Sequence, residues 1–228
     1  MSNLAVIPAR GGSKRIPLKN IRDFLGKPII AYSIEIALKS GLFDEVMVST
    51  DDEKIAEVAQ KYGATVPFYR SADAADDYAT LADVMEEVKL TYEEEGKVFE
   101  YICCILPTAP FVTVENLEKG LQMVRQNDVD SVRPVVEFPY PVQRALKKNE
   151  DGTVEMFYPE HRKTRTQDLE PAYYDAGQFY WMRWEPGLRG DKRTGFEISQ
   201  YFAQDIDTFE DWAFAEMKYE MVRREKSG

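Results

Sequence analysis

The sequence predicts an α/β fold built on a doubly wound, mostly parallel sheet. Short, continuous apolar runs, as expected for strands buried on both faces, alternate with segments whose apolar residues repeat at helical spacing. This alternation holds over residues 1–136, which favours strands joined through helices that cover both faces of one sheet. The chain has 228 residues, of which 44% are hydrophobic, so we expect a single domain over residues 1–228.

Local start and stop signals define the first βαβ units. Pro28 suits the first turn of a helix, and Gly41 suits its end. Asp52 is a good cap for the next helix, which Gly63 ends. We therefore expect a helix after each of these start signals, between strands over residues 4–7, 45–49 and 65–68.

The next stretch continues the pattern and then breaks it. Thr80 with Asp83 approximates a capping box, Thr113 can cap a later helix, and Asp211 mimics a capping box for a helix that starts near Thr208. From residue 138 to about residue 172, prolines and charged loop predict an insertion that is too small to hold its own core. The strands expected in this half cover residues 101–106, 131–136, 154–157 and 179–181.

Composition narrows the classes of function. The formal net charge is -11, whereas nucleic-acid binding needs a broad basic face, so we expect no nucleic-acid partner. No apolar run approaches the roughly 20 residues of a membrane span, and no charged signal region is present, which predicts a cytoplasmic protein without membrane contact. The adjacent Cys103 and Cys104 are typical of reduced core thiols, and the single histidine, His161, favours a surface role over catalysis.

A glycine-rich basic loop follows the first strand and predicts a triphosphate site. Gly11 and Gly12 permit positive φ and close backbone approach, so that N–H groups can converge on phosphate oxygens. The loop fits neither the Walker pattern nor the dinucleotide fingerprint. A solvated basic loop is the alternative, but the charge is concentrated: between positions 10 and 27 the one acid, Asp23, faces Arg10, Lys14, Arg15, Lys19, Arg22 and Lys27.

Two further segments are expected to meet this loop. Residues 49–52 follow the second strand, and residues 107–110 follow a later one. Because ligands bind beyond the carboxyl ends of the strands in an open parallel sheet, residues 10–20 and these two segments should converge on one crevice.

Asp205 and Asp207 form a candidate Mg²⁺ site. Two residues apart on an extended segment, their carboxylates point to the same side. Together they can share a hard cation with a phosphate oxygen, which is the usual protein chemistry of Mg²⁺. The alternative is that Asp207 merely caps the helix that follows.

The whole string over residues 7–20 resembles the signature of the cytidylyltransferases that activate nonulosonic acids, the family of the sialic acid and ketodeoxyoctonate (KDO) activating enzymes. Residues 49–52, 107–110 and 205–211 recur in the expected order, so the resemblance covers nearly the full chain. Residues 138–146, 165–169 and 175–181 are most similar to the branch that activates pseudaminic acid.

This resemblance implies a nucleotide-diphospho-sugar transferase-like Rossmann fold with a small dimerisation insertion at residues 138–172. It implies a homodimer in which the insertion reaches the partner's active site, although a plain surface excursion is the alternative. The implied substrates are CTP and a nonulosonic acid, whose anomeric hydroxyl attacks the α-phosphorus and releases pyrophosphate.

The resemblance also assigns roles to residues. Catalysis would rest on Arg10, Lys19, Asp205 and Asp207, of which the two acids hold Mg²⁺. The nucleotide would be bound by Arg10, Gly11, Gly12, Ser13, Lys14, Lys19, Asn20, Arg70 and Thr80, and the sugar by Arg165, Gln167, Gln178 and Tyr180.

The sugar end departs from the sialic acid branch. Leu106 and Ala176 stand where that branch has a glutamine and an asparagine, which favours pseudaminic acid over N-acetylneuraminic acid. CMP-N-acetylneuraminate or CMP-KDO synthesis is the alternative within the family. A metal-dependent glycosyltransferase and a nucleotide-binding regulator are the rivals from other classes.

Overall fold

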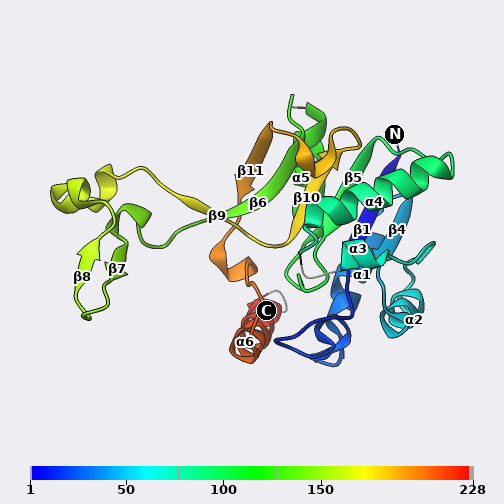
Figure 1. Ribbon diagram of the computed structural model, residues 1–228, viewed down its shortest axis with the longest axis horizontal. Coiled ribbons are helices and arrows are strands. Elements are labelled where there is room, and N and C mark those ends of the chain that lie inside the picture. Colours follow the sequence, from blue (N-terminus) through cyan, green and yellow to red (C-terminus); the bar gives the residue numbers. More distant parts are fainter. Residues whose placement is uncertain (1, 76–77, 127, 226–228) are drawn as a thin grey trace.

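The computed structural model describes residues 2–75, 78–126 and 128–225. Its described part is built around a seven-stranded sheet in the order β11-β6-β10-β5-β1-β4, with β9 paired to β6 (Figure 1). The strands are β1 (Asn3–Pro8), β4 (Glu45–Ser49), β5 (Tyr101–Ile105), β6 (Ser131–Glu137), β9 (Tyr173–Asp175), β10 (Phe179–Arg183) and β11 (Arg193–Glu197).

The sheet is mostly parallel, which confirms the predicted fold class. β1 pairs in parallel with β4 and β5, and β11 pairs in parallel with β6. The exceptions are β10, which lies antiparallel between β5 and β6, and β9, which pairs antiparallel with β6. A strand from late in the chain therefore separates two strands that the sequence places next to each other.

Helices cover both faces of the sheet, as the alternating pattern predicted. α1 (Ile29–Ser40), α2 (Glu53–Lys61) and α5 (Val114–Gln126) pack on one face, in a cluster that includes Ala5 and Ile7. α4 (Leu81–Glu94) packs on the other face, in a cluster that includes Leu4 and Val6. Successive residues of β1 point to opposite faces, so this strand is buried from both sides.

The predicted helix signals are found in place. α1 follows Pro28 and ends at Gly41, which has a left-handed φ of 64°. The Asp52 carboxylate accepts a hydrogen bond from the Ile55 amide at 3.0 Å, at the start of α2. Both halves of the capping box of α4 are formed, and Thr113 accepts a hydrogen bond from the Asn116 amide at 3.2 Å ahead of α5.

One predicted strand is wrong. Residues 65–68 form no strand, and only an isolated parallel bridge joins Thr65 to Met47. Pro67 lacks the N–H that a continuing ladder requires, so pairing stops after the bridge. The predictions also lacked β9, β11, the short helix α3 (Ala72–Ala75) and a hairpin of β2 (Asp23–Phe24) with β3 (Lys27–Pro28).

In a third hydrophobic cluster, the basic loop packs against the C-terminal helix. Ile16 is fully buried and packs with Phe24, Ile206 and Trp212, the last of which belongs to α6 (Phe209–Glu225). The segment before α6 is thereby held against the loop that follows β1. Short 3-10 helices complete the described elements at Lys19–Ile21, Val142–Arg144, Pro159–Lys163, Thr166–Asp168, Gly187–Arg189 and Gln200–Phe202.

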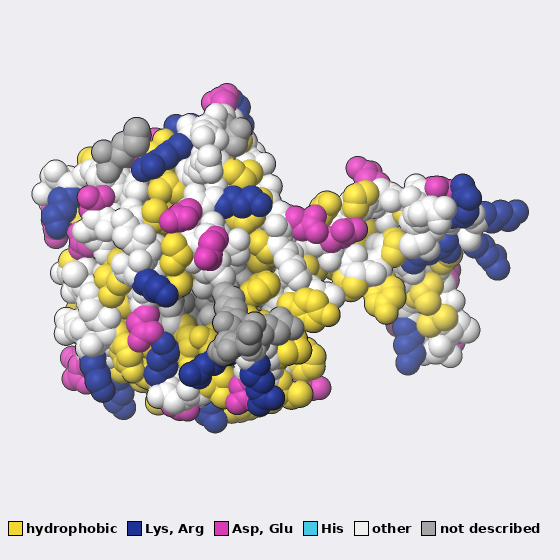
Figure 2. All heavy atoms as spheres, turned by 180° about the vertical axis from the view of Figure 1, so that it is seen from behind, with side chains coloured by type: hydrophobic (Ala, Val, Ile, Leu, Met, Phe, Trp, Pro, Cys, Tyr) yellow, Lys and Arg dark blue, Asp and Glu magenta, His cyan; other side chains and the backbone are white. Residues whose placement is uncertain are grey.

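Residues 138–172 form an arm that projects from the sheet between β6 and β9 (Figure 1). The arm carries the antiparallel pair β7 (Leu146–Lys148) and β8 (Val154–Met156). All its residues are described and none is buried. Figure 2 shows apolar side chains along the arm and Lys and Arg near its far end.

No helix within residues 2–75, 78–126 and 128–225 combines the length and the apolarity needed to cross a bilayer.

Candidate active site

A cavity of about 540 Å³ opens beyond the carboxyl ends of β1 and β5. Its walls include Pro8 at the end of β1, Leu106 just after β5, and Leu81 and Val84 of α4. Five cationic side chains line it, namely Arg10, Lys14, Arg15, Lys19 and Arg70, together with Ser13, Asn20, Pro107, Thr108 and Asp205. The structure thus brings together the loop after β1, the loop after β5 and one acid from near the C-terminus.

The basic loop is fixed from within the protein. Asn20 is buried, and its amide Nδ2 donates to the carbonyl oxygen of Arg10 at 3.0 Å. The Gly11 amide donates to the Asp51 carboxylate at 2.9 Å. This contact ties the start of the loop to the segment after β4.

The two glycines differ from what the sequence predicted. Neither Gly11 nor Gly12 has a positive φ, and neither lines the cavity. A Cβ on Gly11 would lie 2.7 Å from the Asp52 carboxylate, whereas one on Gly12 would meet nothing within 4 Å. Gly11 is therefore needed for close packing, and its N–H is occupied by Asp51 rather than aimed into the cavity.

Residues 49–52 support the cavity instead of lining it, which corrects the expected convergence. The buried Arg70 donates from Nε to the Ser49 hydroxyl at 3.1 Å and from Nη2 to the Ser49 carbonyl at 2.7 Å. Burial lowers the pKa of Arg70, while Asp51 and Glu87 oppose this effect. The guanidinium is thus held rigidly at the cavity wall.

The acidic pair faces the cations of the loop. Ile206 is fully buried between the two acids, Asp205 lines the cavity, and Asp207 Oδ1 lies 2.8 Å from Arg15 Nη2. Lys19 Nζ lies 3.5 Å from the same oxygen and donates to the Ile206 carbonyl at 2.8 Å. Asp205 therefore lines the cavity, whereas Asp207 contacts two of its cationic residues without lining it.

The alternative that Asp207 merely caps α6 is wrong. Thr208 caps α6, because its hydroxyl accepts from the Asp211 amide at 3.2 Å, and the Asp211 carboxylate accepts in return from the Thr208 amide at 2.8 Å and from the Asp207 amide at 3.1 Å. The bonds from Thr208 hold the pKa of Asp211 below its ordinary value. The side chain of Asp207 is left to interact with Lys19 and Arg15.

The donor set of Asp205 and Asp207 fits Mg²⁺. Within the described ranges, no group of three or more His, Cys, Asp or Glu side chains is arranged to hold a metal. Two carboxylate donors suit Mg²⁺ because this ion usually takes one or two carboxylates and completes its shell with phosphate and water. Zinc, which prefers four nitrogen or sulfur donors in structural sites, would not fit.

Two further predicted residues, Thr80 and Gln178, do not line the cavity. Thr80 does not line it, and its hydroxyl donates to Asp83 at 2.7 Å in the cap of α4, whereas the adjacent Ala79 does line it. Gln178 is buried, its backbone carbonyl accepts from the amide of the cavity residue Leu106 at 2.8 Å, and its Nε2 donates to the Phe202 carbonyl. Its Oε1 has no hydrogen-bond partner within the described chain.

Arg165 and Gln167 are not brought to this cavity. Both are exposed on the arm, where Arg165 pairs with Asp168 at 2.9 Å. The arm projects away from the sheet (Figure 1), and none of its residues lines the cavity. Their predicted contact with the sugar therefore requires a second chain.

Two features of the cavity were not assigned from the sequence. Arg15 was counted in the basic run, but its pairing with Asp207 could not be inferred without the position of α6. Leu81 and Val84 form an apolar wall of the cavity, and their helical spacing alone does not distinguish such a wall from a core-facing side of the helix.

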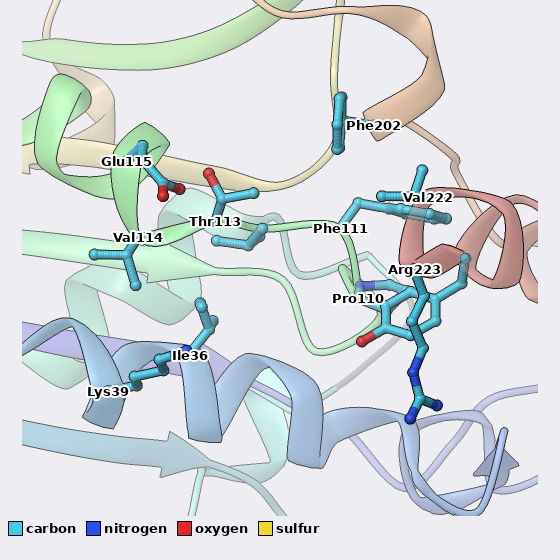
Figure 3. Close-up of a pocket in the computed structure, with 12 residues that line it drawn as sticks. Ile36, Lys39, Pro110, Phe111, Thr113, Val114, Glu115, Phe202, Val222 and Arg223 are labelled. Carbon is cyan, nitrogen blue, oxygen red and sulfur yellow. The ribbon is translucent and has the colours of Figure 1, made fainter. Parts of the chain in front are cut away.

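A second cavity, of about 330 Å³, lies between α1, the start of α5 and α6 (Figure 3). Phe111, Phe202 and Val222 line it, with Lys39 and Arg223 also in its wall. None of the predicted site residues belongs to it, and its lining is mainly apolar. A triphosphate therefore fits the first cavity and not this one.

The sequence is similar to those of known cytidylyltransferases. The sequence profile of the cytidylyltransferase family matches residues 4–226. A pseudaminic acid cytidylyltransferase from Campylobacter jejuni is 44% identical over 226 residues, covering 97% of each chain. A CMP-N,N'-diacetyllegionaminic acid synthase from Legionella pneumophila is 32% identical over 237 residues, again covering 97% of each chain.

Solved structures show the same fold. A CMP:2-keto-3-deoxy-manno-octonic acid synthetase complexed with CTP has a TM-score of 0.69 at 19% identity, with 98% of this chain and 100% of that one covered. At this identity the likeness supports the architecture of the sheet and helices alone.

Proposed function

The chain belongs to the cytidylyltransferase family, and we propose that it transfers CMP from CTP to the anomeric hydroxyl of pseudaminic acid, releasing pyrophosphate. The observation that carries the proposal is the concentration of Arg10, Lys14, Arg15, Lys19 and Arg70 around one cavity in a chain of net charge -11. Such a cavity attracts a compact polyanion and not an extended one.

The triphosphate would lie on the basic loop. Arg10 and Lys19 would stabilise the charge that develops on pyrophosphate as it leaves, which is the main demand of phosphoryl and nucleotidyl transfer on a protein. Ser13 and Ala79, which both line the cavity, would border the base. Arg70, already fixed by Ser49, would contact the nucleotide without having to be reoriented.

Asp205 and Asp207 would hold Mg²⁺. When bound, the ion supplies charge neutralisation at the α-phosphate and lowers the pKa of the sugar hydroxyl. Asp207 would then exchange its present partners, Arg15 and Lys19, for the metal, and both cations would become available to phosphate oxygens.

Transfer would be direct, without a covalent enzyme intermediate. The Ser49 hydroxyl accepts from Arg70 and has no adjacent base. Cys103 and Cys104 are completely buried, and burial raises the pKa of both thiols, so neither supplies a thiolate at neutral pH. Attack by the sugar hydroxyl on phosphorus needs neither group.

The choice of pseudaminic acid rests on the sugar end of the site. Leu106 lines the cavity and Ala176 is buried, where the sialic acid branch is expected to present amides. A site without these amides should accept a less hydroxylated sugar, such as one with a deoxygenated terminal carbon. The relative from Campylobacter jejuni supports the same choice.

The active form would be a cytoplasmic homodimer. Leu146, Val154 and Phe157 are each more than half exposed on an arm that contains no buried residue. A second chain that covers these side chains would receive Arg165 and Gln167 near its own cavity. The free thiols of Cys103 and Cys104 agree with a reducing compartment.

The test is an assay of pyrophosphate release with CTP, Mg²⁺ and a panel of nonulosonic acids. We expect a CMP-sugar with pseudaminic acid, at a kcat/KM well above those for N-acetylneuraminic acid and KDO. Better use of N-acetylneuraminic acid or KDO would assign the enzyme to that substrate. Release of a nucleoside diphosphate from a sugar nucleotide would indicate a glycosyltransferase, and CTP binding without turnover would indicate a regulator.

A further inference from the structure

One face of the sheet is only partly covered by helices. On the α4 side, Leu4, Met47 and Cys104 are buried in a common cluster with α4 residues. Farther along the sheet, Arg133 and Val135 of β6 and Tyr180 of β10 are half-buried on the same side, and Gly195 of β11 is exposed. α4 lies over the β1 and β4 side of the sheet in Figure 1, away from β6 and β11.

Arg133 is the cation of this uncovered face, and it is held in place by its neighbours. Its Nη1 lies 2.8 Å from Asp175 Oδ2, and its guanidinium lies 4.8 Å from the centroid of the Tyr180 ring. The other oxygen of Asp175 accepts from the Gly177 amide at 2.9 Å, so the carboxylate is itself fixed. Of the five N–H donors of Arg133, the described chain engages one in a hydrogen bond.

Gln178 lies between the uncovered face and the wall of the candidate cavity, although neither Gln178 nor Tyr180 lines that cavity. Gln178 directly precedes β10, and alternation continued by one residue would place its side chain on the side of Tyr180. Gln178 accepts from the amide of Leu106, which lines the cavity, and Gln178 Oε1 is a buried acceptor without a partner in the described chain. From β5 to β6 the distance is two strand spacings, about 10 Å.

Distance decides which part of a sugar acid could reach Arg133. The anomeric carbon must approach the α-phosphate near Asp205, and the sugar carboxylate is attached to that same carbon. Both groups therefore lie at the cavity, on the near side of Leu106. The opposite end of the sugar, which carries the amide and side-chain substituents, would then extend from β5 across β10 to β6.

The chemistry at Arg133 suits an acyl amide. The free edge of a guanidinium donates to a carbonyl oxygen, and an aromatic ring beside it packs against a methyl group. Gly195 lies opposite Arg133 in the strand register, and the Val135 side chain packs over it, so that a Cβ on Gly195 would lie 2.9 Å from Val135 Cγ1. Burial raises the pKa of Tyr180, so this ring remains uncharged at neutral pH.

We propose that Arg133 is a specificity-determining residue that donates to the acyl oxygen of an amide substituent on the far end of the nonulosonic acid, and that Asp175 positions it. This inference rests on the proposed function, because it requires that such an acid binds. It adds a residue from β6 to a sugar site so far assigned to β10 and the arm.

The experiment compares Arg133→Met and Arg133→Lys with wild type on pseudaminic acid and on KDO, which carries no amide. Loss of one hydrogen bond from a charged donor costs about 1.5–3 kcal/mol, so Arg133→Met should raise KM for pseudaminic acid by about 10- to 100-fold. KM for CTP should not change, the weaker use of KDO should be unaffected, and Arg133→Lys should recover part of the loss.

Arg193→Met is the matched control. Arg193 lies on β11 on the same face of the sheet, opposite Ser131, and is therefore two residues farther than Arg133 from the carboxyl end of β6. It should leave every constant unchanged. Equal losses on both sugars, or an unchanged KM for pseudaminic acid in a folded Arg133→Met variant, would overturn the inference. Failure of the proposed function is distinguishable, because wild type would then form no CMP-sugar at all.

Discussion

The sheet and the arm bury their apolar side chains in opposite ways. Ile7 and Val48 of the sheet are fully buried between layers of the same chain, whereas Leu146 and Phe157 of the arm are more than half exposed. The cationic cavity belongs to the sheet and is complete within one chain. The residues proposed to bind CTP thus come from one chain, whereas the exposed apolar side chains of the arm are what the proposed homodimer would explain.

The largest effect is expected from Asp207→Ala, which tests the proposed site on the sheet. We expect turnover to fall by about 10²- to 10³-fold, the loss typical of removing one electrostatic group from a transition state. Chelation of Mg²⁺ in wild type should have a comparable effect. Glu210→Ala, three residues away and exposed, is the control and should stay active. Full activity in excess EDTA would contradict the metal assignment.

The arm is tested by Leu146→Asp combined with Phe157→Asp. Each charge should weaken self-association by about 2 kcal/mol or more if the side chain is an interface anchor. The variant should sediment as a monomer, keep the melting temperature of the sheet and lose activity at least about tenfold, because Arg165 could no longer reach a second cavity. Lys147→Ala, on the opposite side of β7, should remain dimeric. A variant that is still dimeric would place the interface elsewhere.

Mixing two inactive variants sharpens the comparison further. Arg165→Ala removes a residue of the arm, and Asp207→Ala removes one from the cavity. If the arm acts on its partner, each mixed dimer contains one intact site, and random mixing should restore about a quarter of wild-type activity. The readout is activity after subunit exchange, with the unmixed variants as controls. No recovery would mean that Arg165 serves its own chain or no site.

The smallest effect is expected from Gly11→Ala. The new Cβ would lie 2.7 Å from the Asp52 carboxylate, so the loop or the start of α2 must shift at a cost of about 1–3 kcal/mol. We expect a lower melting temperature and a higher KM for CTP. Gly12→Ala is matched in chemistry but meets nothing within 4 Å, and both quantities should be unchanged. Equal behaviour of the two variants would refute the packing role of Gly11.

Local signals explain how much of the fold could be predicted. Caps such as Asp52 and Thr80 act within one turn of their own helix, so the sequence alone places them. β9 and β11 are short strands whose pairing with β6 depends on distant residues, and no local signal marks them. The apolar pattern predicts a strand from Thr65 onward, but Pro67 has no N–H to donate, so only the bridge from Thr65 to Met47 forms.

In the candidate site, too, local features could be predicted and contacts between distant residues could not. The cations of the basic loop are neighbours in the sequence, so their convergence was predictable. The bond from Arg70 to Ser49 and the pairing of Arg15 with Asp207 join residues far apart in the chain, and only the folded sheet brings them together. Arg165 lies exposed on the arm, and its proposed role depends on a second chain whose position a single chain does not give.

The ion pairs of Asp207 with Arg15 and Lys19 have a thermodynamic consequence. A triphosphate competes with Asp207 for these cations, and Mg²⁺ competes with the cations for Asp207. CTP therefore frees Asp207 for Mg²⁺, and Mg²⁺ frees Arg15 and Lys19 for CTP, so the binding of the two ligands should be positively coupled. Because such coupling is reciprocal, Mg²⁺ should tighten the binding of CTP by the same factor by which CTP tightens the binding of Mg²⁺.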